Sequence, residues 1–325
     1  MALSDFNLDA ASVASLKPAQ DIFPEIVSGR IAHIDADFIA YQVAAETKQE
    51  LDPDDPTERR TYEQMTEQAD EAAQYIRKMA GAEQAVLHIT KSIHKGYRVD
   101  IAKLKPYQGN RANRIKPDNL EGIKEFLGRG ANSYELTGCI SVQQEADDTM
   151  CQAMFADPQA VLCSADKDLL MVPGKRLNHK TYCIEDQLDH FGFIKIDTET
   201  SSKKIVGRGT KFFWAQCLTG DNADNISGLP ECPGEIAGTK SGKPKKCGPV
   251  LAYDLIKDAT DDAECFKIVK ECFVRLSKDH GYQFKHWKTG ENITATQALL
   301  SEMQLLWMRR NPTPNDVLHW LKETL

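Results

Sequence analysis

The sequence lacks long apolar runs and paired-cysteine motifs, and both absences exclude classes of protein. No segment reaches the roughly 18 consecutive apolar residues that a membrane span needs. The N-terminal residues 1–5 lack the basic and apolar regions of a secretory signal peptide, so a cytoplasmic protein without a membrane partner is expected. No glycine-rich nucleotide-binding loop occurs either, and ATP is therefore not implied.

The nine cysteines show no CxxC spacing, which argues against a disulfide framework or a zinc ribbon. Cys163 and Cys217 lie in apolar runs, where a thiol acts as a small hydrophobic group. Cys232 and Cys247 flank a loop rich in glycine and lysine. Because no CxxC or histidine pair accompanies them, we expect no metal at that loop.

The composition is that of a globular protein. Hydrophobic residues make up 41% and charged residues 27% of the 325 positions, which excludes collagen, coiled coil and general disorder. The net charge of −8 opposes a nucleic-acid partner on average, but the charge is unevenly spread. Eight basic residues against one acid lie between Lys91 and Lys116, and four lysines lie between residues 240 and 246. Such runs are usually solvent-exposed faces, so they indicate nucleic-acid binding only where residues that bind or cleave phosphate groups lie beside them.

Alternating apolar runs and helical patterns in the first half predict a mostly parallel sheet flanked by helices. The predicted strands are residues 30–37, 85–90, 139–142 and 160–163. The predicted helices between them are residues 38–45, 61–80, 120–127 and 145–155. After about residue 205 the pattern becomes helical, at residues 211–218, 250–257, 261–277, 294–309 and 315–325. We therefore expect two domains, residues 1–205 and 206–325.

Four clusters of acidic residues follow predicted strands or begin predicted helices. They are Asp35 with Asp37; Glu145, Asp147 and Asp148; Asp166 with Asp168; and Asp221 with Asp224. Ligands of parallel α/β sheets bind beyond the carboxyl ends of the strands, so these acids are expected to converge there. Asp37 is left out of the predicted site, because it points away from Asp35 if the strand continues through both.

Carboxylates gathered in one pocket repel each other unless cations neutralise them. Hard oxygen ligands bind hard ions, so the clusters predict two Mg²⁺ ions, or Mn²⁺, in a site suited to phosphoryl transfer. The alternative for any single cluster is a helix cap or a wet loop. That alternative is weaker for the four clusters together, because each follows a predicted apolar strand or begins a predicted helix.

Three of the clusters lie within longer motifs that resemble a known family. The motifs are Glu145-Ala146-Asp147-Asp148, residues 164–170 (SADKDLL) and residues 218–225 (LTGDNADN), and they follow the strand end Ile34-Asp35. In this order, residues 30 to 257 resemble the 5′-nuclease (flap endonuclease) superfamily. The element Tyr107-Gln108-Gly109-Asn110-Arg111 looks most like the 5′→3′ exonucleases of T7-like bacteriophages.

The resemblance implies a fold and a set of site residues. The expected fold is a PIN-like α/β domain with a helical arch at about residues 91–130 and a helix-three-turn-helix-type DNA-binding region. Arg111 matches a basic position of the arch element and is expected to be catalytic. The residues that match the family's metal-binding positions are Asp35, Glu145, Asp147, Asp148, Asp166, Asp168, Asp221 and Asp224.

The resemblance also implies an activity. The expected reaction is metal-dependent hydrolysis of phosphodiesters from the 5′ end of duplex DNA or from a 5′ flap, leaving a 5′-phosphate. RNA in RNA–DNA hybrids is a further expected substrate, which fits primer removal and phage DNA replication and recombination. The expected state is a monomer in the host cytoplasm.

Basic residues near the motifs are expected to hold DNA by its phosphates, with steep salt dependence and little sequence preference. For Tyr107, stacking on an unpaired base and simple packing both remain open. The expected DNA-binding residues are Lys105, Tyr107, Arg111, Arg114, Lys243, Lys245, Lys246 and Gly248.

Three departures from the family pattern have consequences for the site. Many relatives carry lysine where this chain has Gln108, so the cation near the phosphate must come from Lys105, Arg111 or Arg114. No acid follows the second strand, where relatives have one. The compact glycine hairpin of the DNA clamp is interrupted by an insertion rich in glycine and lysine between residues 230 and 247.

Two other functions remain as alternatives. The departures fit a noncatalytic protein that binds DNA structures. A haloacid-dehalogenase-type phosphatase is suggested by Asp35-Ala36-Asp37 and by the Gly220–Asp224 segment. Against the phosphatase, Ile39 replaces a small hydroxylated residue, and the acids at 145–148 and 166–168 are left without a role.

Overall fold

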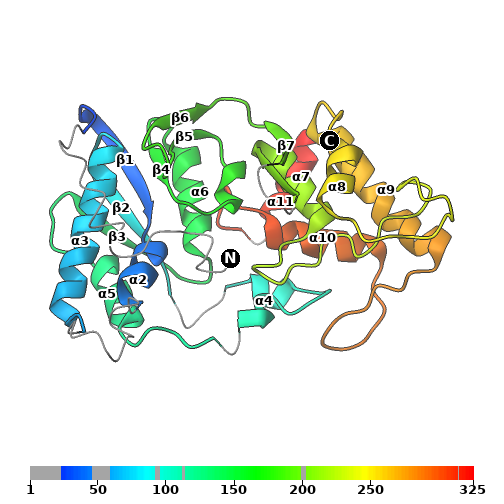
Figure 1. Ribbon diagram of the computed structural model, residues 1–325, viewed down its shortest axis with the longest axis horizontal. Helices are drawn as coiled ribbons and strands as arrows, with labels where there is room; N and C mark the ends of the chain where they lie inside the picture. Colours follow the sequence, from blue (N-terminus) through cyan, green and yellow to red (C-terminus); the bar gives the residue numbers. More distant parts are fainter. Residues whose placement is uncertain (1–22, 46–58, 92–95, 112–113, 199–202, 314) are drawn as a thin grey trace. The chain divides into compact units, whose positions relative to one another are not determined.

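The computed structural model describes residues 23–45, 59–91, 96–111, 114–198, 203–313 and 315–325. Packing divides the chain into two compact units (Figure 1). Unit 1 comprises Met1–His94, Ile115–Ala165 and Gly174–Asp186. Unit 2 comprises Lys95–Arg114, Asp166–Pro173 and Gln187–Leu325. The domain boundary expected near residue 205 stays a prediction.

Unit 1 is built around a six-stranded sheet with the order β3-β2-β1-β4-β5-β6. Its strands are β1 (Val27–Asp35), β2 (Ala82–Thr90), β3 (Leu136–Ser141), β4 (Val161–Cys163), β5 (Gly174–Leu177) and β6 (Ile184–Gln187). β1 pairs in parallel with β2 and β4, and β2 with β3. β4 also pairs in parallel with β5. The predicted mostly parallel sheet is confirmed. Apolar runs such as Val161–Cys163 lie in its interior because strands covered on both faces need apolar side chains on both.

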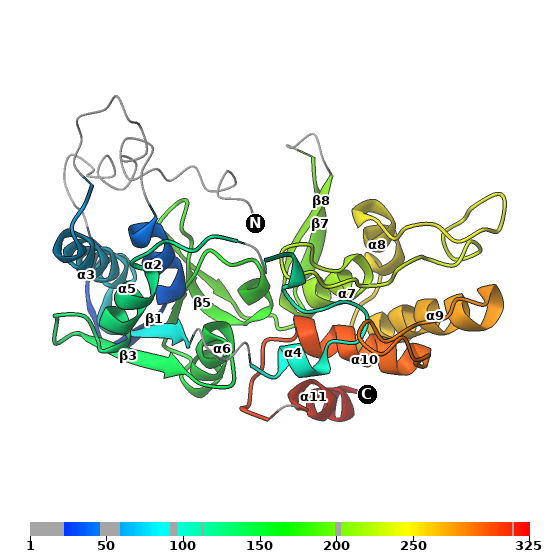
Figure 2. The same cartoon turned by 90° about the horizontal axis from the view of Figure 1, so that it is seen from below.

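Helices cover both faces of this sheet. The helices are α2 (Ala36–Ala44), α3 (Tyr62–Met79), α5 (Leu120–Gly128) and α6 (Ala146–Ala156). α2, α3 and α5 pack against one another on one face, and α6 lies on the other (Figure 2). α3 starts at a capping box in which Thr61 and Gln64 each bond the other's backbone N–H. The core between the layers includes Ile34, Leu87 and Ile123.

Unit 2 is mainly helical, with one antiparallel hairpin. Its elements are α4 (Arg98–Ile101), the 3-10 turns η2 (Gly109–Arg111) and η3 (Asp168–Met171), β7 (Phe193–Asp197), β8 (Lys204–Arg208), α7 (Gly209–Thr219), α8 (Pro249–Ile256), α9 (Asp262–His280), α10 (Ala295–Leu306) and α11 (Asp316–Thr324). α7 is the central helix, with every residue from Gly209 to Leu218 buried. Trp307 belongs to the core and stacks on Trp320 with ring centroids 4.3 Å apart.

The described part of the expected arch contains little helix of its own. It holds the four-residue α4 and the turn η2, whereas α5 buries Leu120, Ile123 and Leu127 in the core of unit 1. Residues 92–95 and 112–113 of this segment lie outside the described residues. The interpretation of the basic run as a solvated stripe is wrong for Arg98, which is 1% exposed and donates to the carbonyls of Leu305 and Trp307.

Residues 220–248 join α7 to α8 through turns, in the region expected to hold the helix-three-turn-helix element. Cys232 and Lys245 exchange two backbone hydrogen bonds, which close the base of the insertion rich in glycine and lysine. All nine cysteines are free thiols. Among the described residues, no helix combines the length and apolarity that crossing a membrane requires.

Candidate metal centre

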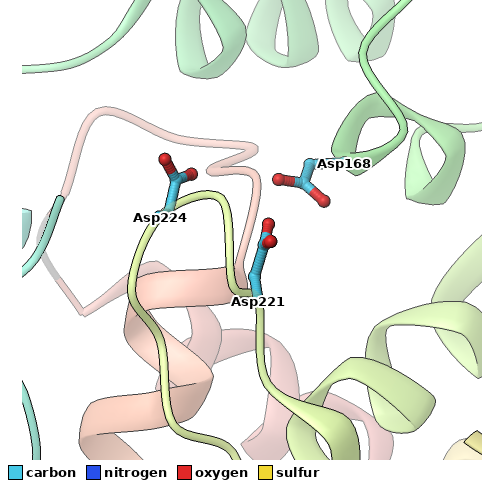
Figure 3. A group of neighbouring side chains, drawn as sticks. All are labelled: Asp168, Asp221 and Asp224. Carbon is cyan, nitrogen blue, oxygen red and sulfur yellow. The ribbon is translucent and has the colours of Figure 1, made fainter. Parts of the chain in front are cut away.

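Three carboxylates of unit 2 converge. Asp168 lies at the start of η3, and Asp221 and Asp224 lie on the loop that follows α7 (Figure 3). One oxygen from each lies within 4.8 Å of the others. Across the residues that the structure describes, no other group of three Asp, Glu, His or Cys side chains meets this spacing. Residues far apart in sequence therefore supply a compact set of hard oxygen ligands.

The fold of the loop explains why Asp221 and Asp224 face the same way. Gly220 ends α7 with φ of +70°, a conformation that glycine adopts without strain. A Cβ on Gly220 would lie 2.4 Å from the carbonyl oxygen of Ile226. Asp221 and Ile226 exchange two backbone hydrogen bonds of 3.0 and 2.7 Å, and the Asp221 side chain accepts from the Ala223 N–H at 2.8 Å. The turn is thus closed tightly around the residues that carry the carboxylates.

The segment after β4 brings Asp166 and Asp168 into the same turn. The Asp168 N–H donates to Oδ1 of Asp166 at 2.8 Å. Burial, followed by the charge of Asp166, raises the pKa of Asp168 well above its usual value. Burial also raises the pKa of Asp166, and the charges of Asp224 and Asp221 add to the effect. These directions are those of carboxylates gathered in one place.

Two cations lie against the cluster. Nζ of Lys167 lies 2.9 Å from Oδ2 of Asp221 and 3.9 Å from Oδ1 of Asp168. Burial opposes the charge of Lys167, but the carboxylates of Asp168 and Asp221 outweigh it and raise the pKa of the amine. Arg111 bonds Oδ1 of Asp224 at 2.6 Å. Four carboxyl groups, counting Asp166, therefore lie against only two cations, so acidic groups remain in excess in the cluster.

Two glutamine amides complete the surroundings, and sequence reasoning gave neither a place in the cluster. Nε2 of Gln216 donates to Oδ1 of Asp168 at 2.6 Å, and Nε2 of Gln108 donates to Oδ1 of Asp224 at 3.1 Å. Gln216 lies on α7, five positions before Asp221, so the LTGDNADN motif could have pointed to the preceding helix. For Lys167, the only signal in the sequence is its position between Asp166 and Asp168.

The segment from Pro106 to Arg111 is hydrogen-bonded to the aspartate loop, which is the loop of residues 220–228 that follows α7. The Gln108 N–H donates to the Asp224 carbonyl at 2.8 Å, and Nε of Arg111 donates to the Ala223 carbonyl at 3.0 Å. Nδ2 of Asn110 donates to the Asn222 carbonyl at 2.8 Å. The element that carries the family resemblance at residues 107–111 therefore lies against the loop that carries Asp224.

The predicted acids of unit 1 lie at its strand and helix ends. Asp35 ends β1, caps α2 through the Phe38 N–H at 3.2 Å and accepts from the Ser164 hydroxyl at 3.0 Å. Glu145 is the N-cap of α6, and Asp148 is fully buried with Oδ2 3.4 Å from the Glu145 N–H. Asp147 is partly buried in the first turn of α6. That all eight acids form one site stays a prediction.

Asp37, excluded from the predicted site, has structural partners. It bonds Nζ of Lys124 at 2.8 Å and the Thr90 N–H at 3.0 Å. It lies in the first turn of α2 rather than on the strand. These partners explain Asp37 without a role in chemistry.

The expected DNA-binding residues differ in exposure. Tyr107 is only 5% exposed, so its ring is packed in this conformation. Arg111 is partly exposed and faces Asp224. Gly248 is the N-cap of α8. The exposed members are Lys105, Arg114, Lys243, Lys245 and Lys246.

The donor set fits a hard divalent cation. Asp168, Asp221 and Asp224 supply only carboxylate oxygens, which are the ligands that Mg²⁺ and Mn²⁺ prefer. No sulfur or imidazole lies in the cluster, which argues against zinc or copper.

Comparisons with known proteins give a likeness of fold. No protein-family model matches the sequence, and no curated protein matches it. Solved structures similar to the chain include a bacteriophage T5 protein co-crystallised with metal ions, with a TM-score of 0.49 and 14% identity over 85% of this chain and 86% of that one. A second is a bacteriophage T5 flap endonuclease in a pseudo-enzyme–product complex with DNA and metal ions, with a TM-score of 0.47 and 13% identity over 85% and 88%. Flap endonucleases are the class that the sequence motifs resemble.

Proposed function

We propose that this protein is a metal-dependent nuclease that hydrolyses phosphodiesters at or near the 5′ end of DNA, as an exonuclease or on a flap. The observation that carries the proposal is the convergence of Asp168, Asp221 and Asp224 within 4.8 Å. Two divalent ions, Mg²⁺ or Mn²⁺, would supply water activation and neutralisation of phosphate charge. The preference for a 5′ end rests on the sequence motifs.

The residues of the cluster have separate proposed roles. The divalent ions are held by four carboxylates, those of Asp166, Asp168, Asp221 and Asp224. Lys167 neutralises part of their negative charge through its ion pair with Asp221. Arg111 pairs with Asp224 and presents its partly exposed guanidinium to a phosphate. The unit 1 acids proposed to serve the same hydrolysis are Asp35, Glu145, Asp147 and Asp148.

Exposed basic residues are proposed to bind the phosphate backbone. Lys105 and Arg114 flank the 107–111 element, and Lys243, Lys245 and Lys246 belong to the insertion closed by the Cys232–Lys245 bridge. Phosphate contacts of this kind carry no sequence information. Duplex DNA with a 5′ end or flap is the proposed partner, and an RNA–DNA hybrid a further one.

The test is product analysis with duplexes labelled at the 5′ or the 3′ end, with and without flaps. We expect cleavage from the 5′ end in Mg²⁺ or Mn²⁺ and none in excess EDTA. Asp166→Ala and Asp221→Asn should each lower cleavage by at least about 100-fold and leave DNA binding within about threefold. Asp258→Asn is the matched control, because it removes an exposed carboxylate outside the cluster. Unchanged cleavage by Asp221→Asn would contradict the proposal.

A noncatalytic DNA-binding protein is the second candidate. The pairs Arg111–Asp224 and Lys167–Asp221 favour it, because they neutralise part of the cluster without a metal ion. The same labelled duplexes decide between the two. Tight binding without cleavage in both Mg²⁺ and Mn²⁺ would favour the binding protein.

A further inference from the structure

Glu302 is a buried carboxyl group that the proposed chemistry does not use. It lies on α10 and is 0% exposed. Oε2 accepts a hydrogen bond from the Gly228 N–H at 2.7 Å. Oε1 lacks a hydrogen-bond partner within the described part of the chain. Burying a carboxyl group is unfavourable, so a specific contact must explain its presence.

The buried surroundings of Glu302 disfavour the charged form of this carboxyl group. Burial raises the pKa of Glu302 to about 7, and the backbone N–H groups of Gly228 and Ser227 and the charge of Lys105 act in the opposite direction. Both protonation states keep an oxygen available to accept the Gly228 N–H. The contact with Gly228 therefore does not depend on one charge state.

Gly228 connects Glu302 to the aspartate loop. Its φ of +63° is one that glycine adopts readily, and a Cβ there would lie 2.2 Å from the backbone nitrogen of Gly220. Gly220 directly precedes Asp221. The Leu229 N–H also donates to the Leu218 carbonyl at 3.2 Å, so the two ends of the loop are held together beside Glu302.

We propose that Glu302 is a positioning residue for the loop that carries Asp221 and Asp224. It holds the Gly228 N–H, keeps the loop ends closed and so fixes the spacing of the two carboxylates. In no contact that the structure describes does it touch the carboxylates, so it acts through the backbone. The consequence for metal binding rests on the proposed function, whereas the anchoring of Gly228 does not.

Three variants separate this role from a general loss of stability. Glu302→Gln keeps an oxygen acceptor for Gly228, and Glu302→Leu removes it. Asp316→Leu is the matched control, because Asp316 is another buried carboxyl group of unit 2. Its side chain accepts hydrogen bonds from Nε1 of Trp307, the Arg310 N–H and Nδ2 of Asn311. If Glu302→Leu does not fold, Glu302→Asp carries the test, since it shortens the side chain by one methylene group.

The first measurement is hydrogen exchange of the Gly228 amide by NMR. Glu302→Leu should accelerate this exchange by at least about 100-fold, whereas Glu302→Gln should stay within about tenfold of wild type. Asp316→Leu should not accelerate it selectively. Unchanged protection of Gly228 in Glu302→Leu would overturn the proposal.

The second measurement is Mn²⁺ affinity by calorimetry. Glu302→Leu should bind Mn²⁺ at least about tenfold more weakly, with recovery to within about threefold in Glu302→Gln. Equal weakening by Asp316→Leu would overturn the positioning role. A wild-type protein that binds no Mn²⁺ but shows the expected exchange pattern would contradict the proposed function and support the anchor.

Discussion

At the scale of single residues, Arg111 has two different hydrogen-bonding tasks. One guanidinium nitrogen bonds Asp224, and Nε donates to the Ala223 carbonyl. Lysine has one donor centre and cannot reproduce this fork. Arg111 therefore bonds the loop backbone and also adds positive charge beside a proposed metal ligand. Gln108 and Asn110 bond the same loop backbone, so the loop does not depend on Arg111 alone.

This double role predicts opposite effects on metal binding and cleavage. Arg111→Ala should bind Mn²⁺ several-fold more tightly, because a cation that repels the ion is removed. The same variant should cleave DNA at least about tenfold more slowly, and Arg111→Lys should recover only part of the rate. Calorimetry and single-turnover cleavage measure the two quantities. Weaker Mn²⁺ binding by Arg111→Ala would contradict this account.

A second residue-scale feature is the buried histidine pair of unit 1. Nδ1 of His33 lies 2.9 Å from Nε2 of His88, whose Nδ1 lies 2.8 Å from the Thr149 hydroxyl. Burial lowers the pKa of His33 to about 4. Burial, and then the charge of His33, lowers that of His88 to about 3. Both rings are therefore neutral in the folded protein near pH 5.

The pair predicts a loss of stability on acidification. Between pH 6.5 and the lowered pKa values the unfolded chain binds protons that the folded chain does not, so stability falls as pH falls. At pH 5 each ring contributes a loss of about 2 kcal/mol. The free energy of unfolding, measured with urea, should fall between pH 7 and pH 5 in both proteins. The fall should be about 2 kcal/mol smaller in His88→Gln than in wild type. An equal loss would contradict this, and the exposed His319→Gln serves as control.

At the scale of elements, the sequence patterns located most helices and the inner strands. The pattern of residues 61–80 predicts a helix, and α3 spans Tyr62–Met79 with its N-cap at Thr61 and its C-cap at Ala80. The strands of residues 85–90 and 160–163 were found because their apolar runs are buried. β5 (GKRL) and β6 (IEDQ) were missed, since short polar strands have no such run.

The candidate site shows the same division. Asp168, Asp221 and Asp224 could be named because they stand in motifs with fixed spacing. Gln216 and Glu302 could not, because their roles come from helix packing that places them against residues distant in sequence. A buried polar residue in a helix carries no local signal of its partner.

The tight closure of the aspartate loop predicts that replacing a glycine by alanine lowers the stability most where a Cβ atom has no room. Gly228→Ala places a Cβ 2.2 Å from backbone, whereas Gly242→Ala, at a similar φ of +66°, meets nothing within 4 Å. The control should lose about 1 kcal/mol from backbone strain alone. Gly228→Ala should lose at least about 2 kcal/mol more, measured by urea unfolding. Equal losses would show that the loop can open without cost.

The helix ends of unit 2 give a further prediction. Arg98 donates to the carbonyls of Leu305 and Trp307 at the C-terminal end of α10, which would otherwise be unpaired. Arg98→Met should destabilise the protein by about 2 kcal/mol, and Arg98→Lys by less. Arg114→Met changes an exposed arginine and should lie within about 0.5 kcal/mol of wild type. The free energy of unfolding in urea checks all three, and a neutral Arg98→Met would contradict this account.

At the scale of the whole molecule, charge distribution matters more than net charge. The chain carries −8 in total, yet Lys243, Lys245 and Lys246 are exposed together on the insertion. If these lysines bind DNA phosphates, each should contribute about 0.9 to the slope of log K against log salt. The uneven distribution then permits DNA binding by an acidic protein.

Salt titration tests this directly. Replacing Lys243, Lys245 and Lys246 with alanine should reduce the slope by about 2 to 3 and weaken binding equally for different DNA sequences. The control replaces the exposed residues Lys180, Lys195 and Lys322 and changes the net charge by the same amount. Equal effects of the two sets would mean that only overall charge matters.

The chain passes between the two units five times, after residues 94, 114, 165, 173 and 186. Unit 2 is therefore incomplete until its last stretch, Gln187–Leu325, has been synthesised, although its first stretch begins at Lys95. No single truncation separates one intact unit from the other. The Asp166–Pro173 stretch packs against α7 and β8, so the carboxylate cluster cannot assemble before the ribosome has released the chain through Asp224.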